Sequence, residues 1–317
     1  MIMDYLTQLH HGIQLVLAAI FSVLCFATVL VHGLKWRYPD RDYTELWLRI
    51  RSWWIMVFLF CGALIVSRTV AIAFFALISY LALKEYFSII PTRRADRRVL
   101  FWAYLAIPIQ FFWVWLADYG FFIIFIPVYM FLLLPMQMVI VGETDRFLRA
   151  AGTIHWGLMT MVFSVSHLAF LLALPDHGDA LAGGPGLVLY LVVLTQFNDV
   201  AQYTWGKLLG KRKIIPKVSP NKTWAGFVGG VATTTALAVA LAPFLTPMQW
   251  PMAMAAGVLI AISGFIGDVT ISALKRDLQI KDSGNLLPGH GGILDRIDSL
   301  TYSAPLFMHF IRYFYYT

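Results

Sequence analysis

One stretch of an otherwise hydrophobic chain, from Ser272 to Asp298, is rich in charged residues and glycines. It contains four cations, four carboxylates and a histidine: Lys275, Arg276, Lys281, Arg296, Asp277, Asp282, Asp295, Asp298 and His290. Charges beside a membrane are costly unless they are paired or bind a ligand. Cationic side chains neutralise phosphate, and glycines such as Gly291 and Gly292 let backbone N–H groups approach phosphate oxygens closely. We therefore predict that this stretch is an active site that binds phosphate and metal.

An aspartate near the end of a hydrophobic run, Asp268, precedes this stretch. Asp295 follows it by 27 positions, at the far end of the glycine-rich loop. We predict that the two carboxylates bind one divalent ion, because Mg²⁺ prefers carboxylate and phosphate oxygens. Lys275 and Arg276 would then help to neutralise a triphosphate, a pattern typical of metal-assisted phosphoryl or nucleotidyl transfer. The alternative is that these charges only cap helices and form ion pairs at the membrane surface.

A second polar cluster lies upstream, within and after a further hydrophobic run. Asn198 and Asp199 are polar groups inside that run, so we predict that they face the bundle interior and position metal, nucleotide or water. Hydrogen bonding between helices is the alternative role. In the following loop, Ser219 or Thr223 is placed to cap the next helix, whose amino end would point its positive dipole at a phosphate beside Lys222. Capping without a ligand is again the alternative.

The composition indicates that these residues are positioned by membrane helices. Hydrophobic residues make up 60% of the chain and charged residues 13%, against roughly 25% charged in soluble domains. Mean hydropathy is +0.73, which indicates a polytopic, all-α membrane protein. A span needs about 20 mostly apolar residues. The candidate runs are 12–31, 52–67, 69–83, 99–117, 120–141, 155–174, 184–205, 225–245 and 251–271, with a tenth at 300–316 that contains Arg312. Because only Arg68 separates the second run from the third, we predict a tight helical hairpin there.

Basic residues favour one orientation of these nine to ten helices, since lysine and arginine are retained on the cytoplasmic side. All of the 24 basic residues except Arg68 and Arg312 fall in five alternate loops. These loops begin at Lys35, Lys84, Arg146, Lys207 and Lys275. We predict an amino terminus outside, catalytic loops facing the cytoplasm and a bacterial inner membrane. The net charge of +7 favours anionic lipid head groups and nucleotide phosphates, but its spread over five loops argues against a nucleic-acid partner.

The polar motifs all lie in the second half of the chain. We predict a scaffold of membrane helices at 1–145 and a catalytic membrane region at 146–317, with its motifs at 196–298. Cys25 and Cys61 both lie in apolar runs, so the sequence suggests neither a disulfide framework nor a zinc site.

In these motifs the chain resembles the phosphatidate cytidylyltransferases, also called CDP-diacylglycerol synthases. The run SALKRDLQIKDSGNLLPGHGGILDRID, residues 272–298, is similar to the family signature at every element. Ser219-Pro-Asn-Lys222-Thr223 and the helix with Asp199 also resemble the family. The resemblance implies an all-helical membrane enzyme of phospholipid biosynthesis that condenses CTP with phosphatidic acid, giving CDP-diacylglycerol and pyrophosphate. It further implies a need for Mg²⁺ and assembly as a homodimer.

Position by position, the resemblance implies roles for individual residues. It implies that Asp268 and Asp295 bind the metal and that Ser219, Lys222 and Thr223 bind phosphate. The polar positions around the metal-binding acids are matched by Lys275, Arg276, Lys281 and Asp282. We place Asp298 with the catalytic acids, and Asn198, Asp199, His290, Gly291, Gly292 and Arg296 with the substrate-binding groups. Two positions depart from the family pattern: Ala225 replaces a usual glutamate, and Asn221 replaces a common lysine. The alternatives are a CTP-dependent lipid kinase, which attacks the γ-phosphorus, and a noncatalytic protein that kept the fold.

Overall fold

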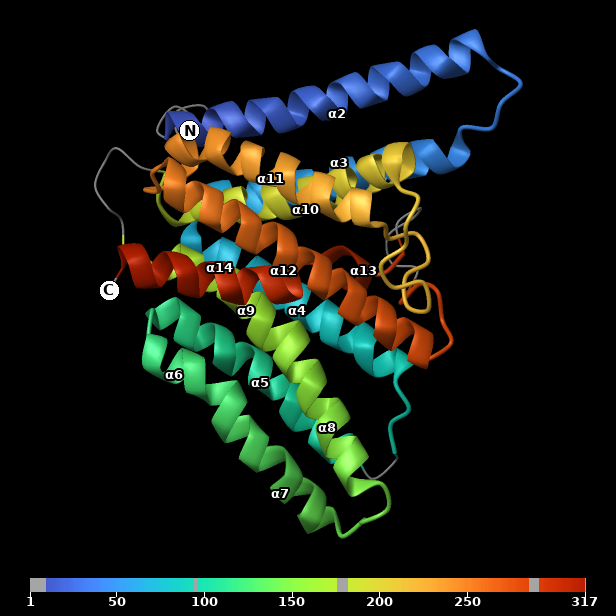
Figure 1. Cartoon of the computed structure of the whole chain (residues 1–317). Coiled ribbons are helices and arrows are strands. Elements are labelled where there is room, and N and C mark those ends of the chain that lie inside the picture. Colours follow the sequence, from blue (N-terminus) through green and yellow to red (C-terminus); the bar gives the residue numbers. More distant parts are fainter. Residues whose placement is uncertain (1–9, 94–95, 176–181, 285–290, 317) are drawn as a thin grey trace.

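The computed structural model describes residues 10–93, 96–175, 182–284 and 291–316. This part of the chain is helical apart from loops and one isolated bridge between Lys213 and Thr223 (Figure 1). The α-helices are α2 (His11–Arg37), α3 (Thr44–Val66), α4 (Arg68–Ile89), α5 (Arg97–Leu116), α6 (Tyr119–Ile124), α7 (Phe131–Val141), α8 (Phe147–Gly157), α9 (Ser164–Phe170), α10 (Gly183–Leu209), α11 (Trp224–Leu245), α12 (Trp250–Asp277), α13 (Leu294–Ile297) and α14 (Leu300–Tyr315). The π-helical segments η2 (Phe125–Met130) and η3 (Leu158–Phe163) join α6 to α7 and α8 to α9, and the 3-10 turn η4 (Leu171–Ala173) follows α9.

In the described residues, nine helical segments are long and apolar enough to span a membrane, which confirms the nine main predicted spans. Two of them are composite: Tyr119–Val141 contains α6, η2 and α7, and Phe147–Ala173 contains α8, η3, α9 and η4. The tenth predicted run forms α14, which has 16 residues and is not among the nine. The helix α14 packs against α12 and α9, and its residues Ala304, Phe307 and Ile311 are buried.

The predicted hairpin of the second and third runs is confirmed, because a single residue, Ser67, separates α3 from α4. Both helices are longer than the apolar runs 52–67 and 69–83 that predicted them. Charged residues extend them at the same end of the hairpin, where Glu45 lies in the first turn of α3 and Glu85 belongs to the last turns of α4. These extensions carry polar groups of the amino-terminal half toward the loops of the carboxy-terminal half.

Three long helices, α10, α11 and α12, pack closely against one another and form the framework of the site. A Cβ at Gly257 of α12 would lie 2.7 Å from Ala238 of α11, and one at Gly230 of α11 would collide with Gln202 of α10. Small residues at such contacts let membrane helices approach closely enough for van der Waals contact to hold them together. The close packing brings the polar ends of α10 and α12 to the same place.

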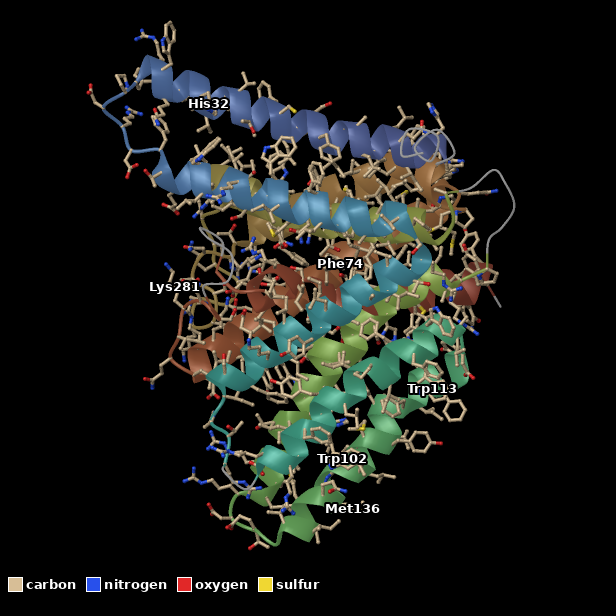
Figure 2. The ribbon with its side chains drawn as sticks, turned by 180° about the vertical axis from the view of Figure 1, so that it is seen from behind. His32, Phe74, Trp102, Trp113, Met136 and Lys281 are labelled. Atoms are coloured by element: carbon tan, nitrogen blue, oxygen red, sulfur yellow. The ribbon has the colours of Figure 1, made fainter. Side chains whose placement is uncertain are left out.

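Successive spans alternate in direction, so the loops after α2, α4, α7, α10 and α12 lie at one end of the bundle, which is the right-hand and lower side in Figure 1. These are the five basic loops. Figure 2 shows Lys281 at this end, whereas Met136, which is half exposed, lies on an outward face rich in apolar side chains. The polar end of the bundle therefore contains both the basic loops and the predicted active-site residues.

Candidate active site

A cavity of about 1020 Å³ lies at the loop-bearing end, between α3, α10, α12 and the stretch around α13. Most of the residues predicted from the sequence line it: Asp199, Lys222, Asp268, Lys275, Lys281, Asp282, Gly291, Asp295, Arg296 and Asp298. The two polar clusters of the sequence thus meet in one cavity. Its combination of cations with carboxylates suits a ligand that contains both phosphate and a metal ion.

Lys222 is held at a defined point of the cavity. Its Nζ lies 2.5 Å from Asp268 Oδ2 and donates a hydrogen bond of 2.9 Å to Oε1 of Gln202. The ammonium also lies 5.6 Å from the centre of the Phe265 ring, within the range of a cation–π interaction. Three groups from α10 and α12 therefore position one positive charge before any ligand binds.

Asp295 organises the glycine-rich loop. Its Oδ1 lies 2.6 Å from Lys275 Nζ, and its Oδ2 accepts hydrogen bonds from Ser283 N at 3.0 Å, Ser283 Oγ at 2.8 Å and Gly292 N at 3.2 Å. Burial opposes ionisation of this carboxyl, but these hydrogen bonds and the Lys275 charge outweigh burial and lower the pKa of Asp295. Gly291 has φ +83°, and a Cβ there would lie 2.8 Å from Asp295 Oδ2, so the loop requires glycine.

Three carboxylates gather elsewhere in the cavity. Ser299 Oγ donates a hydrogen bond of 3.1 Å to Asp199 Oδ2, and Ser299 N donates one of 2.7 Å to Asp298 Oδ1. Burial raises the pKa of Asp298 well above its ordinary value, and the neighbouring charges of Asp268 and Asp199 raise it further. Among the described residues, only Asp268 of these three has a lysine at ion-pair distance. The cluster therefore has three carboxylates and one paired lysine, an excess of negative charge that a divalent cation would offset.

Glu85 of α4 reaches the site from the amino-terminal half. Its carboxylate accepts hydrogen bonds from Ile293 N at 2.9 Å and Leu294 N at 3.1 Å, and another from Ser283 Oγ. It therefore satisfies backbone N–H groups at the start of α13 and fixes the glycine-rich loop. A Cβ at Gly292 would collide with the Glu85 carboxylate, so this contact explains a second glycine of the loop.

Motif spacing does not single out Glu85, because its partners follow more than half the chain later. The sequence does contain a signal for Glu85, because Lys84 and Glu85 are charged residues that interrupt an apolar run. The distribution of basic residues over the loops uses only Lys84 of this pair. The residues Glu45, Arg49 and Trp53 of α3 also line the cavity and also precede every motif. The amino-terminal helices thus contribute directly to the site as well as supporting it.

Sequence comparison decides the family to which this site belongs. The profile of the cytidylyltransferase family matches residues 47–314, a range that includes nearly all of the cavity wall. The chain belongs to the cytidylyltransferase family. This membership confirms the resemblance found in the motifs.

Individual relatives of this family member differ in how much of the chain they match. The uncharacterized protein YnbB of Escherichia coli K12 is 47% identical over 94% of this chain and 97% of its own length. The phosphatidate cytidylyltransferase of Mycobacterium leprae is 44% identical over 38% of the chain, and that of Bacillus subtilis is 42% identical over 39%. The matches span 39% and 46% of those two enzymes, so similarity to the named enzymes is confined to less than half of each protein.

Some predicted residues of this cytidylyltransferase family member lie away from the cavity wall: Asn198, Ser219, Thr223, Arg276 and Gly292. Asn198 donates a hydrogen bond of 3.1 Å to Ala261 O and accepts one of 3.2 Å from Thr234 Oγ1. It therefore joins α10 to α12 and α11, which is the helix-packing alternative. Arg276 Nε donates a hydrogen bond of 3.2 Å to Val218 O and ties the end of α12 to the loop between α10 and α11.

The segment from Ser219 to Thr223 contributes mainly by positioning Lys222. Thr223 Oγ1 accepts a hydrogen bond of 3.1 Å from Gly226 N, which confirms the predicted cap of α11. Ser219 accepts a hydrogen bond of 3.3 Å from Lys222 N through its backbone oxygen and forms a turn. The remaining predicted residue, His290, lies outside the described residues.

Among the described residues, no three His, Cys, Asp or Glu side chains already form a metal-binding group. Mg²⁺ does not require one, because it is commonly held by one or two carboxylates together with waters and substrate phosphates. Asp295 already accepts hydrogen bonds from protein donors on both oxygens, whereas Asp298 accepts one, from Ser299 N. Asp268 also accepts hydrogen bonds on both oxygens, from Lys222 Nζ and Ser272 Oγ, but it lies close to Asp298. The residues therefore fit a Mg²⁺ ion that binds with a nucleotide, and Asp298 and Asp268 together could hold it.

Proposed function

We propose that this protein transfers the cytidylyl group of CTP to phosphatidic acid, giving CDP-diacylglycerol and pyrophosphate. The observation that carries the proposal is a single cavity at the polar end of a membrane bundle, in which Lys222, Lys275 and Lys281 stand among carboxylates. Family membership supports CTP as the nucleotide, and the Mycobacterium leprae and Bacillus subtilis relatives are named phosphatidate cytidylyltransferases. A cavity at this end of the bundle is accessible both to a soluble nucleotide and to a lipid head group.

In the proposed reaction, an oxygen of the lipid phosphate attacks the α-phosphorus of CTP while the bond to pyrophosphate breaks in line. Asp268 holds Lys222, and Asp295 holds Lys275, so two positive charges are fixed where negative charge develops. A lipid phosphate is already a nucleophile near neutral pH, and the reaction therefore needs no strong general base. Positioning and charge neutralisation supply most of the rate in this mechanism.

We propose that Asp268 and Asp298 hold Mg²⁺ beside Asp199. When bound there, Mg²⁺ would act as a Lewis acid toward the nucleotide phosphates. The sequence-based pairing of Asp268 with Asp295 as metal ligands stays a prediction, and the hydrogen bonds of Asp295 favour a role in holding the loop.

The reaction class can be tested with purified protein, Mg²⁺, phosphatidic acid and CTP labelled either in the cytidine or in the γ-phosphate. Cytidine label in the lipid product supports the transferase. If only γ-phosphate reaches the lipid, the protein is a CTP-dependent lipid kinase. If neither label reaches any phospholipid acid, the protein is a noncatalytic member of the family.

A glutamate at position 225 is expected to increase activity. Ala225 lies in the first turn of α11, two residues after the cap Thr223 and three after Lys222. A carboxylate there would interact favourably with the helix dipole and help to orient Lys222. We expect Ala225→Glu to raise kcat/KM for CTP roughly 5- to 150-fold, corresponding to about 1 to 3 kcal/mol of transition-state stabilisation. Ala225→Gln is the matched control without the charge, and an equal gain in both variants would contradict the electrostatic explanation.

We also propose that the protein is a homodimer of a bacterial inner membrane with its cavity facing the cytoplasm. The YnbB relative is bacterial, and the five basic loops share the end of the bundle at which the cavity lies. Cross-linking of the purified protein in lipid nanodiscs, resolved by mass, measures the oligomeric state.

The orientation can be measured by thiol labelling in intact cells. In a chain with Cys25→Ser and Cys61→Ala, we expect Lys211→Cys in the basic loop before α11 to resist an impermeant maleimide. Gln249→Cys, exposed at the opposite end between α11 and α12, is expected to react. The reverse pattern of labelling would place the cavity outside the cell.

A further inference from the structure

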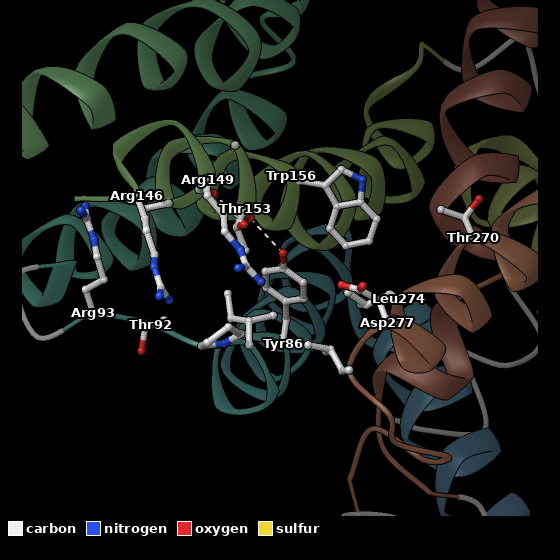
Figure 3. Close-up of a pocket in the computed structure, with 15 residues that line it drawn as sticks. Tyr86, Thr92, Arg93, Arg146, Arg149, Thr153, Trp156, Thr270, Leu274 and Asp277 are labelled. Carbon is white, nitrogen blue, oxygen red and sulfur yellow. Dashed lines mark hydrogen bonds between the residues drawn. The ribbon is translucent and has the colours of Figure 1, made fainter. Parts of the chain in front are cut away.

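A second cavity, of about 510 Å³, lies between the ends of α4, α8 and α12 (Figure 3). It shares no lining residue with the candidate active site. The helix α12 separates the two, because Asp268 and Lys275 face the active site whereas Thr270 and Leu274 face this second cavity. The cavity is therefore a distinct space at the loop-bearing end of the bundle, and the proposed reaction does not use it.

Two arginines supply its available positive charge. Arg146 and Arg149 extend in the same direction from the start of α8 (Figure 3). Within the described part of the chain, the Arg149 guanidinium has no ion-pair or hydrogen-bond partner. Arg146 lies 3.8 Å from Asp145, and both side chains are largely exposed, so this pair is weak.

The remaining charged groups of the cavity wall do not cancel the charge of Arg146 and Arg149. Arg93 is already bound to Asp96, with an N–O distance of 2.7 Å. Among the described lining residues, Asp277 is the one carboxylate, and it belongs to α12, across the cavity from α8 (Figure 3). Two arginines, Arg146 and Arg149, are thus available to bind an anionic ligand, and Asp277 is the one carboxylate that opposes them among the described lining residues.

The rest of the wall is largely apolar. The Tyr86 hydroxyl donates a hydrogen bond of 2.9 Å to Thr153 O, so this polar group is already satisfied. Trp156, Ile90 and Leu274 supply apolar surface next to the arginines. Because three span ends meet here, the cavity lies at the depth where a bilayer places its lipid phosphates.

We propose that this second cavity binds the phosphate head group of an anionic membrane lipid. Arg146 and Arg149 would pair with the phosphate, and the apolar wall would contact the glycerol and the first carbons of the acyl chains. The apolar wall favours a lipid over a free phosphate ion, which would leave that surface uncovered. This inference does not depend on the proposed cytidylyl transfer.

A thiol placed in the wall can report occupancy. Gly152 of α8 lines the cavity, and a Cβ at this position would have no neighbouring atom within 4 Å, so Gly152→Cys is sterically tolerated. With Cys25→Ser and Cys61→Ala, the rate of labelling by a soluble maleimide would be measured in detergent. The probes are dioctanoyl phosphatidylglycerol, dioctanoyl phosphatidylcholine and inorganic phosphate. Phosphatidylglycerol carries a phosphodiester and is therefore not an acceptor in the proposed reaction.

We expect phosphatidylglycerol to protect the thiol at lower concentration than the other two probes. Arg146→Gln with Arg149→Gln should raise the half-protecting concentration about 25-fold, since each basic residue near an anionic lipid contributes roughly 5-fold. Arg97→Gln with Arg98→Gln removes the same charge from exposed positions of α5 outside both cavities and should leave protection unchanged. Gly33→Cys on α2 controls for general effects of lipid on labelling.

Three results would overturn the proposal. Equal protection by phosphatidylcholine would show that the anionic phosphate is not recognised. Unchanged protection in the double glutamine variant would remove the arginines from the site. Equal protection by inorganic phosphate would assign the cavity to a soluble anion instead of a lipid.

Discussion

Asp268→Asn is expected to lower kcat for cytidylyl transfer at least about 100-fold, the typical effect of removing one group that stabilises transition-state charge. The carboxylate holds Lys222 at 2.5 Å, and it is one of the two proposed ligands of Mg²⁺. Asparagine keeps the size of the side chain but removes its charge, so both roles are lost together. The measurement is single-turnover formation of labelled CDP-diacylglycerol at saturating Mg²⁺.

The control for this variant is Asp40→Asn, the same chemical change in an exposed loop residue outside both cavities. It should leave kcat within about 2-fold of the wild type, since surface changes away from a site have small effects. Size-exclusion elution in detergent should be the same for both variants. A normal kcat for Asp268→Asn at saturating Mg²⁺ would mean that neither lysine positioning nor metal binding depends on this carboxylate.

Glu85→Gln is expected to reduce turnover roughly 10- to 100-fold, although Glu85 does not line the cavity. Its carboxylate accepts hydrogen bonds from Ile293 N, Leu294 N and Ser283 Oγ. Glutamine replaces one of the two accepting oxygens by an NH₂ group, which cannot accept a hydrogen bond, so at least one of these N–H or O–H donors is left unpaired. Loss of this hydrogen bond favours opening of the glycine-rich loop. Activity and limited proteolysis at residues 278–284 and 291–293 should therefore change together.

Glu143→Gln provides the matched substitution, because Glu143 is an exposed glutamate in another loop at the same end of the bundle. We expect it to retain normal activity and normal resistance to protease. A Glu85→Gln variant that is inactive but keeps a protease-resistant loop would instead indicate that Glu85 acts on the substrate directly. If both activity and loop protection persist, the hydrogen bonds of Glu85 do not hold the loop.

Local physical constraints explain which parts of the site were predictable. Asp199, Asp268 and Asp298 are carboxylates in or beside hydrophobic runs, and their energetic cost singles them out as functional in any fold. The direction of a side chain has no such local signature. Asn198 and Asp199 are neighbours on α10, yet Asn198 hydrogen-bonds to α11 and α12 while Asp199 faces the cavity. Arg276 turns to Val218 O in the same way, while the adjacent Lys275 faces Asp295.

The sequence by itself determined the membrane helices, the common end of the basic loops, the glycine-rich stretch and the family, because hydrophobic length, charge bias and motif spacing are properties of neighbouring residues. Only the tertiary structure decided that Glu85 of α4 holds Ile293 and Leu294, and that Glu45, Arg49 and Trp53 of α3 complete the cavity. These contacts join residues about 200 positions apart. They arise from the way in which the helices pack in three dimensions. The local sequence of a hydrophobic span does not show which helices it will pack against, because its surface is nearly uniformly apolar.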